Sequence, residues 1–288
     1  MNIFLTGGTG YIGSSVLDHL VRGGHHVTAL VRSEESAAKV SAAGATALHG
    51  DITDITWLTG EIAKSDGAIH TASPGDATSE AVDRGVVQAA VQAFGSTTKP
   101  FLYTSGIWIY GNASTITEHT PVAPPALTAW RPSVEALISG SDLTWSIIVP
   151  AVVYGHGKGI PALLPAAPRT ESGALPAIGD GHQHWTAVHV DDLGSLYVTV
   201  LDQGFGSGYV IGAGPENPTV LELTTAAAHG AEVVPEGADA SRERLGAYFA
   251  DALMLDQQAV ATKAHSLGWR PKGPSLLEDL ATGSYTHD

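Results

Sequence analysis

The sequence predicts an α/β protein built on a doubly wound parallel sheet, with a second, smaller α+β lobe. Strand-like and helical segments alternate up to Pro150, and a glycine-rich turn joins the first strand to the first helix. Such alternation is typical of a parallel sheet with helices on both faces, wound by right-handed crossovers. Beyond Pro150 the chain becomes rich in glycine, proline and histidine without a clear period, which indicates a different architecture.

Apolar patterning predicts the individual elements. Short apolar runs predict strands at residues 2–5, 27–31, 46–48, 68–71, 101–104 and 146–149. Apolar residues that recur with helical spacing predict helices at residues 14–22, 35–43, 54–63 and 80–94. In the second half, "GYVIG" at residues 208–212 predicts a strand, and residues 220–229 and 241–255 predict helices.

Charge and composition exclude several classes of protein. The chain carries 14 basic and 29 acidic residues, for a net charge of −15, without the basic stripe that a nucleic-acid partner would require. It has no cysteine, which excludes disulfides and thiolate chemistry, and its 13 histidines form no H-E-x-x-H pair, so no metal is predicted. No apolar run reaches the ~18 residues of a membrane helix, and the first strand leaves no room for a signal peptide. We therefore expect a soluble, cytoplasmic protein.

The segment "TGGTGYIG" at residues 6–13 is the strongest functional signal. Gly7, Gly10 and Gly13 stand between a predicted strand and a predicted helix. In that context the glycines allow a tight turn, close approach of a pyrophosphate and close packing of helix on strand, which is the fingerprint of a Rossmann-type dinucleotide site. Tyr11 and Ile12 lie in this turn, just before the amino end of the helix, where free N–H groups favour an anion.

The end of the second strand favours NADP over NAD. An NAD-binding protein usually carries Asp or Glu ~20 residues past the glycines, where it binds the ribose hydroxyls. This chain has Arg32 followed by Ser33. A guanidinium can bind a 2′-phosphate and Ser33 can add a hydrogen bond, so NADP is the predicted cofactor and NAD the alternative.

Two further strand ends complete the predicted cofactor site. Asp51 follows the third strand and is a candidate partner for the adenine amino group, with Ile52 packing on the ring. Thr71, Ala72 and Ser73 follow the fourth strand at the carboxyl edge of the sheet, where cofactors lie in such folds.

These signals divide the chain by function. We expect residues 1–152 to form a dinucleotide-binding domain, with residues 186–212 returning to it. Residues 153–185 and 213–288 are then expected to form a smaller substrate-binding lobe.

Four ordered motifs span nearly the whole chain: "TGGTGYIG", "YTSGIWIYG", "IIVPAVVYG" and "WTAVHVDDLG". Together they resemble the extended short-chain dehydrogenase/reductase superfamily, in its NAD-dependent epimerase/dehydratase group. The resemblance implies a nicotinamide cofactor, oxidoreductase or epimerase chemistry, and Val152 among the residues near the cofactor. Its members often pair through two long helices, which implies a homodimer through helices near residues 80–94 and 126–139.

The catalytic residues that the resemblance implies are missing. The superfamily uses a serine or threonine, then a tyrosine and a lysine four residues apart on a helix. Alignment on "IYG" places Gly106 at the serine position, and alignment on Glu135 places Leu127 and Arg131 at the tyrosine and lysine positions. No tyrosine occurs between positions 110 and 154 and no lysine between 99 and 158, so a shift in register does not restore the pair.

Three functions therefore remain open. The first is an atypical oxidoreductase in which Arg131 binds the nicotinamide ribose, while Ser105, Thr104, Tyr154 or His156 polarises a carbonyl or hydroxyl substrate. The second is an NADP-binding sensor or regulatory protein without turnover. The third is a non-redox isomerase or hydrolase. The retained substrate lobe favours an enzyme.

The substrate is not readable beyond its broad class. A nucleotide sugar would require cations that hold its phosphates, and the candidates in the second lobe are Lys158, Arg169, Arg242, Arg244 and Arg270. Because that lobe is otherwise acidic, a small carbonyl or ene compound is the better expectation.

Overall fold

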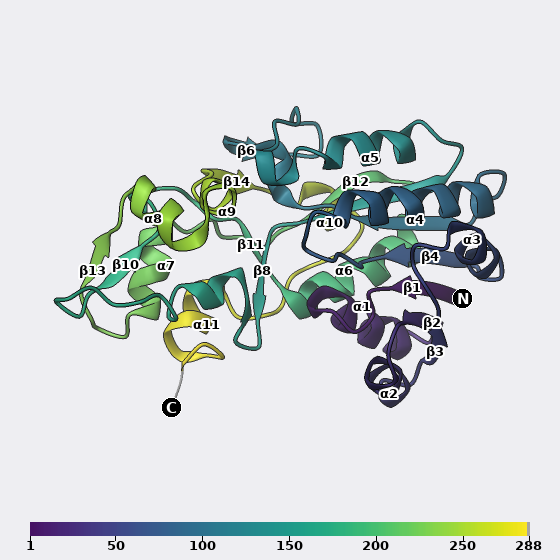
Figure 1. Ribbon diagram of the computed structural model, residues 1–288, viewed down its shortest axis with the longest axis horizontal. Helices are drawn as coiled ribbons and strands as arrows, with labels where there is room; N and C mark the ends of the chain where they lie inside the picture. The colour runs from purple at the N-terminus through teal and green to yellow at the C-terminus, as the bar shows by residue number, and fades with distance from the viewer. Residues whose placement is uncertain (287–288) are drawn as a thin grey trace.

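The computed structural model describes residues 1–286, and its largest element is a sheet of seven parallel strands (Figure 1). The strands are β1 (Asn2–Thr6), β2 (His26–Val31), β3 (Thr46–His49), β4 (Gly67–His70), β5 (Pro100–Thr104), β7 (Thr144–Pro150) and β12 (Gly208–Gly212). Their order is β12-β7-β5-β4-β1-β2-β3. The chain reverses its direction of winding between β1 and β4, which confirms the predicted doubly wound fold and marks the crevice where such folds bind ligands.

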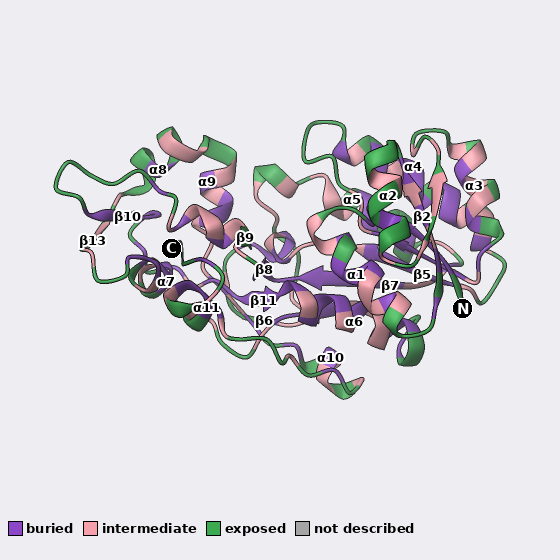
Figure 2. Cartoon of the chain, turned by 90° about the horizontal axis from the view of Figure 1, so that it is seen from below, coloured by how far each residue is buried: buried purple, intermediate pink, exposed green. Residues whose placement is uncertain are grey.

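Helices cover both faces of this sheet. They are α1 (Tyr11–Arg22), α2 (Glu34–Ala42), α3 (Ile55–Ala63), α4 (Ser79–Phe94), α5 (Arg131–Ser139) and α6 (Val190–Gln203). Helices α3, α4 and α5 pack side by side on one face, and α1 packs against α6 on the other (Figure 1). The central strands β1, β4, β5 and β7 are mostly buried, so the core of this part follows the middle of the sheet (Figure 2).

Short sheets and helices form a second part, drawn on the left of Figure 1. Three strands pair in the order β11 (Ala187–His189), β8 (Val152–Gly155) and β9 (Lys158–Gly159), while β10 (Leu175–Ala177) pairs with β13 (Val233–Pro235). Strand β6 (Ala113–Ile116) pairs with β14 (Gln257–Ala259), so a late segment of the chain returns to the edge of the first part.

The remaining elements are short. They are η1 (Ile107–Tyr110), η2 (Ala126–Thr128), η3 (Ile160–Leu163), α7 (Val220–Ala227), α8 (Ala238–Leu245), α9 (Ala247–Leu253), α10 (Thr262–Ser266) and α11 (Leu276–Thr282). Within residues 1–286, no helix combines the length and the apolar character that crossing a bilayer requires.

Two local predictions are wrong, each for a local reason. The single helix expected over residues 241–255 is two helices, because Gly246 adopts a left-handed φ of 84° between them. The helix expected near residues 126–139 begins only at Arg131, with Pro132 in its first turn. Helix α6 is capped by His189, whose side chain accepts a hydrogen bond from the backbone N–H of Asp191.

Candidate functional site

The loop between β1 and α1 has no room for side chains at two of its glycines. Gly7 has a φ of 78°, and a Cβ there would lie 2.5 Å from the backbone nitrogen of Ala72. A Cβ on Gly13 would lie 2.0 Å from the carbonyl oxygen of Gly7. Because both distances are far below van der Waals contact, the glycines hold the loop tightly against the end of β4.

The first turn of α1 offers its backbone to an anion. Gly10 caps the helix with an extended backbone and no side-chain hydrogen bond. The N–H groups of the first turn have no partner within the helix and carry part of its positive end. The loop therefore fits the pyrophosphate of a dinucleotide, in the position that the sequence predicts.

The predicted residues at the end of β4 lie directly beside this loop. Thr71 donates a side-chain hydrogen bond to the carbonyl oxygen of Thr6 at 2.8 Å, which joins the ends of β4 and β1. Thr71 and Ala72 are half-buried and Ser73 is exposed. The structure thus brings the β4 residues and the glycine loop together at the point where the winding reverses.

Arg32, which the sequence predicts to bind the 2′-phosphate of NADP, lies at the end of β2. Arg32 is exposed, and among residues 1–286 its side chain makes no hydrogen bond or ion pair. Ser33 has a second role, because its Oγ accepts a hydrogen bond from the backbone N–H of Ser36 at 3.2 Å and so caps α2.

The predicted adenine segment forms a turn after β3. Asp51 is exposed and accepts hydrogen bonds from the backbone N–H and the hydroxyl of Thr53, which lower the pKa of its carboxyl. Ile52 is half-buried. A Cβ on Gly50 would lie 1.9 Å from the ring of Trp57, so this ring covers the start of the turn.

Arg131 projects from the first turn of α5 to the end of β5. Its Nη1 donates hydrogen bonds to the carbonyl oxygen of Thr104 at 3.2 Å and to the hydroxyl of Tyr103 at 3.4 Å. The same Nη1 lies 3.8 Å from the carboxylate of Asp83, and the guanidinium lies 4.7 Å from the ring centroid of Trp130. The side chain of Arg131 remains 16% exposed, so its charge is held in place yet accessible.

Asp83 is a buried carboxylate that the sequence reasoning missed. It lies on α4 and is 2% exposed. Its Oδ1 lies 3.1 Å from Nε2 of His70, and its Oδ2 accepts a hydrogen bond from the hydroxyl of Tyr103 at 2.5 Å. Burial and the neighbouring negative charge of Asp83 raise the pKa of Tyr103. In the sequence Asp83 stands beside Arg84 in the helical stretch "AVDRGVVQAAVQAF", where it looks like one of several polar residues.

Ser105 and Glu135 form a second buried polar contact. The hydroxyl of Ser105 donates a hydrogen bond to Oε1 of Glu135, and the hydroxyl of Tyr209 donates one to Oε2 at 2.9 Å. Glu135 is 1% exposed, and burial raises the pKa of its carboxyl, although both hydrogen bonds and the charge of Arg131 act in the opposite direction. In the sequence, Glu135 serves only to align the helix with the superfamily, and Tyr209 is not among the predicted site residues.

The two positions that lack the superfamily's serine and tyrosine have distinct surroundings. Gly106 has an extended backbone with φ −170°, and a Cβ there would meet no atom within 4 Å. The glycine is therefore not required by packing. Leu127, at the tyrosine position, lies in η2 and is 37% exposed.

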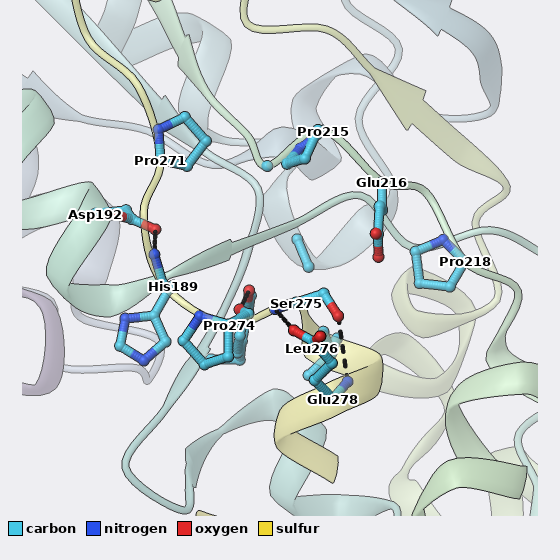
Figure 3. A pocket seen from close by; sticks show the side chains of 14 residues that line it. His189, Asp192, Pro215, Glu216, Pro218, Pro271, Pro274, Ser275, Leu276 and Glu278 are labelled. Carbon is cyan, nitrogen blue, oxygen red and sulfur yellow. Dashed lines mark hydrogen bonds between the residues drawn. The ribbon is translucent and has the colours of Figure 1, made fainter. Parts of the chain in front are cut away.

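Tyr154 lies apart from Ser105 and Arg131. Its hydroxyl donates a hydrogen bond to the carbonyl oxygen of Pro274 at 2.6 Å, and burial raises its pKa. Tyr154 and His189 line a pocket of about 250 Å³ formed by β8, β11 and the segments around Pro215 and Pro274 (Figure 3). Val152, on the same strand, is 5% exposed and packs in the core of the second part. The pocket includes none of the other predicted site residues.

Trp108 of η1 lies against α9, and the arginines in the second half of the chain bind nearby acidic or carbonyl groups. Trp108 and Phe249 meet edge to face, with ring centroids 6.1 Å apart. Arg242 pairs with Asp239 and Asp251, and Arg244 pairs with Glu236. The guanidinium groups of Arg169 and Arg270 donate to backbone carbonyl oxygens.

Comparisons with known proteins agree with this geometry. The sequence model of a family described as NAD(P)H-binding matches residues 7–174. An uncharacterized protein of Schizosaccharomyces pombe is 30% identical over 99% of this chain and 100% of its own length.

Solved structures share the fold at lower identity. The UDP-glucose 4-epimerase of Thermotoga maritima, solved with UDP-glucose, has a TM-score of 0.75 at 21% identity, over 99% of this chain and 98% of the epimerase. A human epimerase family protein solved with NADPH has a TM-score of 0.75 at 18% identity, over 99% of both chains.

Proposed function

The chain belongs to the NAD(P)H-binding family and has the fold of the extended short-chain dehydrogenase/reductase epimerases and dehydratases; from this premise we propose that it is an NADP-dependent oxidoreductase. Its proposed substrate is a small carbonyl or hydroxyl compound. The observation that carries the proposal is the partly exposed guanidinium of Arg131, held by Thr104, Tyr103 and Asp83 where the superfamily has its lysine.

The proposed cofactor residues follow the crevice between β1 and β4. The glycine loop and the first turn of α1 bind the pyrophosphate, and Arg32 binds the 2′-phosphate of NADP. Arg32 suits this role because its charge is exposed and is not neutralised by a carboxylate within residues 1–286. When bound, a nicotinamide supplies or accepts a hydride.

Arg131 takes over two tasks of the missing lysine. Its charge binds the ribose hydroxyls next to the nicotinamide and stabilises negative charge that develops on the substrate oxygen. A guanidinium stays protonated at any relevant pH, so Arg131 serves as an electrostatic group and not as a proton donor.

We propose that Ser105 gives a proton to the substrate and that Glu135 then re-protonates Ser105. In carbonyl reduction the substrate carbon gains a hydride, and its oxygen gains the proton that the Ser105 hydroxyl otherwise donates to Glu135. The protonated carboxyl of Glu135 then returns a proton to the serine, and Tyr209, which is half-buried, connects Glu135 toward solvent. A buried carboxyl with a raised pKa suits this role, because it holds its proton nearer to neutral pH than an exposed one. The open space beside Gly106 gives a substrate access to this point.

The second lobe favours a substrate without phosphates. Two of its five candidate cations, Arg242 and Arg244, are neutralised by carboxylates, which weakens the case for a diphosphate at their position. The Trp108–Phe249 contact instead offers an apolar aromatic surface next to η1.

The proposal is tested in two steps. NADPH and NADH are titrated by fluorescence, and aldehydes, ketones and enones are then screened for NADPH oxidation alongside UDP-glucose. We expect NADPH binding and turnover of an apolar carbonyl, with Ser105→Ala lowering kcat by ~100-fold or more and leaving the Kd for NADPH unchanged. Ser139→Ala, an exposed serine of α5, is the matched control. Full turnover by Ser105→Ala would contradict the assigned proton donor.

A second candidate is a protein that binds NADP without turnover. This candidate is favoured because the hydroxyls of Ser105 and Tyr154 already donate hydrogen bonds within the protein, to Glu135 and to the carbonyl oxygen of Pro274. Neither is therefore free to donate a proton to a substrate without losing that bond. Tight NADPH binding together with no oxidation across the carbonyl panel would support this reading over the enzyme.

A further inference from the structure

Two histidines and an aspartate from separate segments meet beside the first turn of α1. His156 follows β8, and His189 and Asp191 stand at the start of α6. Nε2 of His156 lies 3.0 Å from Oδ2 of Asp191, and Nδ1 of His189 lies 3.9 Å from the same oxygen. One potential ligand atom from each residue lies within 4.8 Å of the others. His189 and Asp191 are two residues apart in the sequence, and the fold brings the distant His156 to them.

The backbone of His156 is strained in order to reach this cluster. Its φ is 55°, a left-handed value that is uncommon for a residue with a side chain. Such a conformation costs on the order of 1 kcal/mol or more. The visible compensation is an ion pair between side chains that are 60% and 48% exposed, and exposed pairs contribute only about 0–1 kcal/mol. The pair alone therefore gives little reason for the strain.

The segment that carries His156 is held at both sides. The hydroxyl of Tyr11 donates to the carbonyl oxygen of Gly155 at 2.9 Å, and the N–H of Gly155 donates to the hydroxyl of Tyr285 at 2.9 Å. The N–H of Gly157 donates to Oγ of Ser284 at 2.8 Å. A rigid framework of this kind fixes side chains in position before any ligand arrives.

We propose that His156, His189 and Asp191 bind one divalent transition-metal ion of the zinc type. Two imidazoles and one carboxylate suit zinc, nickel, cobalt or copper, whereas magnesium and calcium prefer oxygen ligands throughout. Zinc binds such ligands at ~2.0–2.2 Å in tetrahedral geometry, which places the ligand atoms roughly 3.4 Å apart. The observed 3.0 and 3.9 Å bracket that value, so small side-chain rotations complete the site.

One feature of the fold disfavours a cation at this site, and one coordination position is left for water. The amino end of α6 carries a partial positive charge that disfavours a cation, and Asp191 offsets it. Metal binding also replaces the long hydrogen bond of 3.3 Å that Nδ1 of His189 accepts from Asp191. Because His156 and Asp191 are partly exposed, water completes the coordination.

The test uses the full chain, freed of metal by a chelator, and does not depend on dinucleotide or substrate. Co²⁺ is titrated by its visible absorption and Zn²⁺ by calorimetry. We expect one equivalent to bind, with the d–d spectrum of tetrahedral or five-coordinate cobalt. His156→Asn and Asp191→Asn should each weaken binding at least ~10-fold. Asparagine is chosen at 156 because it tolerates a left-handed backbone.

The matched control is His184→Asn. His184 also pairs with an aspartate, Asp256, at 2.8 Å and is also partly exposed, but it lies outside the cluster. Its substitution should leave the metal affinity unchanged. Circular dichroism of each variant verifies the fold. The proposal would be overturned if the wild type showed no saturable metal binding. It would also be overturned if His156→Asn and Asp191→Asn bound the metal as tightly as His184→Asn, because the cluster would then be only an ion pair.

Discussion

The guanidinium of Arg131 lies 3.8 Å from the carboxylate of Asp83, a residue of α4 that is almost completely buried. The buried carboxylate of Asp83 thus helps to fix the position of a guanidinium that is partly exposed at the candidate site. This arrangement ties the stability of the fold to the electrostatics of the candidate site.

Removing that hidden charge should destabilise the protein. Asp83→Asn leaves Arg131 without its buried counter-ion and disturbs the contacts of His70 and Tyr103. We expect a loss of ~3 kcal/mol in the free energy of unfolding, measured in urea. Glu80→Gln, which breaks the exposed Glu80–Arg84 pair on the same helix, should cost under ~0.5 kcal/mol. Equal effects of the two variants would contradict the assigned role of Asp83.

Glycine 13 should be irreplaceable, whereas Gly60 should not. A methyl group at Gly13 would overlap the carbonyl oxygen of Gly7, so Gly13→Ala should abolish NADPH binding and cost ~2 kcal/mol or more. Gly60 lies in α3 with no atom within 4 Å of its Cβ position, so Gly60→Ala should stabilise by ~0.5–1 kcal/mol. Fluorescence titration and urea unfolding measure both effects. Retained NADPH affinity in Gly13→Ala would refute the proposed dinucleotide loop.

Arg32 should set the choice between the two dinucleotides. Arg32→Asp removes the proposed partner of the 2′-phosphate and supplies a carboxylate for ribose hydroxyls, so the ratio of Kd for NADH to Kd for NADPH should fall ~10-fold or more. Lys39→Asp, an exposed cation of α2, controls for the general change in charge. An unaltered ratio in Arg32→Asp would rule out the phosphate contact.

Glu135 should make stability depend on pH in a defined direction. Because burial raises its pKa in the folded chain, the folded state binds this proton more tightly than the unfolded state. The stabilisation is complete below the unfolded pKa of ~4.3 and is lost as the pH rises through the higher folded value. The free energy of unfolding of wild type minus that of Glu135→Gln should therefore fall across this window.

Urea unfolding at a series of pH values measures that difference. Glu243→Gln, at an exposed position, corrects for the loss of one acidic group. A difference that stays constant or increases with pH would show that the fold does not raise the pKa of Glu135.

Gly106 should accept a serine at no cost to the fold. Its backbone is extended and its Cβ position is open, so Gly106→Ser should change the free energy of unfolding by less than ~0.5 kcal/mol. Combined with Leu127→Tyr and Arg131→Lys, it restores the superfamily's residue types at all three positions. We expect the triple variant to oxidise NADPH faster than the wild type with at least one carbonyl of the panel. A large loss of stability in Gly106→Ser alone would contradict the open geometry.

The fold could be predicted because its signals are local. The glycine loop, the apolar strands and the helical spacing each occupy a few consecutive residues, and parallel winding follows from their alternation. Most boundaries differed by at most three residues, for example at α1, which begins at Tyr11 and so takes in Gly13. The split between α8 and α9 was missed because Gly246 inside a helical pattern is only a weak signal.

The candidate site could be predicted only where it follows strand ends. The glycine loop and Thr71 meet as expected, because neighbouring parallel strands end at one edge. Asp83, Glu135 and Tyr209 come from α4, α5 and β12, and their contacts depend on how these distant elements pack. Nothing in the local sequence specifies such a network.

The vacant position beside Gly106 also has a practical use, because the chain contains no cysteine. A thiol introduced there by Gly106→Cys would be the sole reactive sulfur of the protein. It would carry a fluorophore, a spin label or an electrophilic fragment to the centre of the candidate site, and its labelling rate would report whether a bound dinucleotide shields that spot.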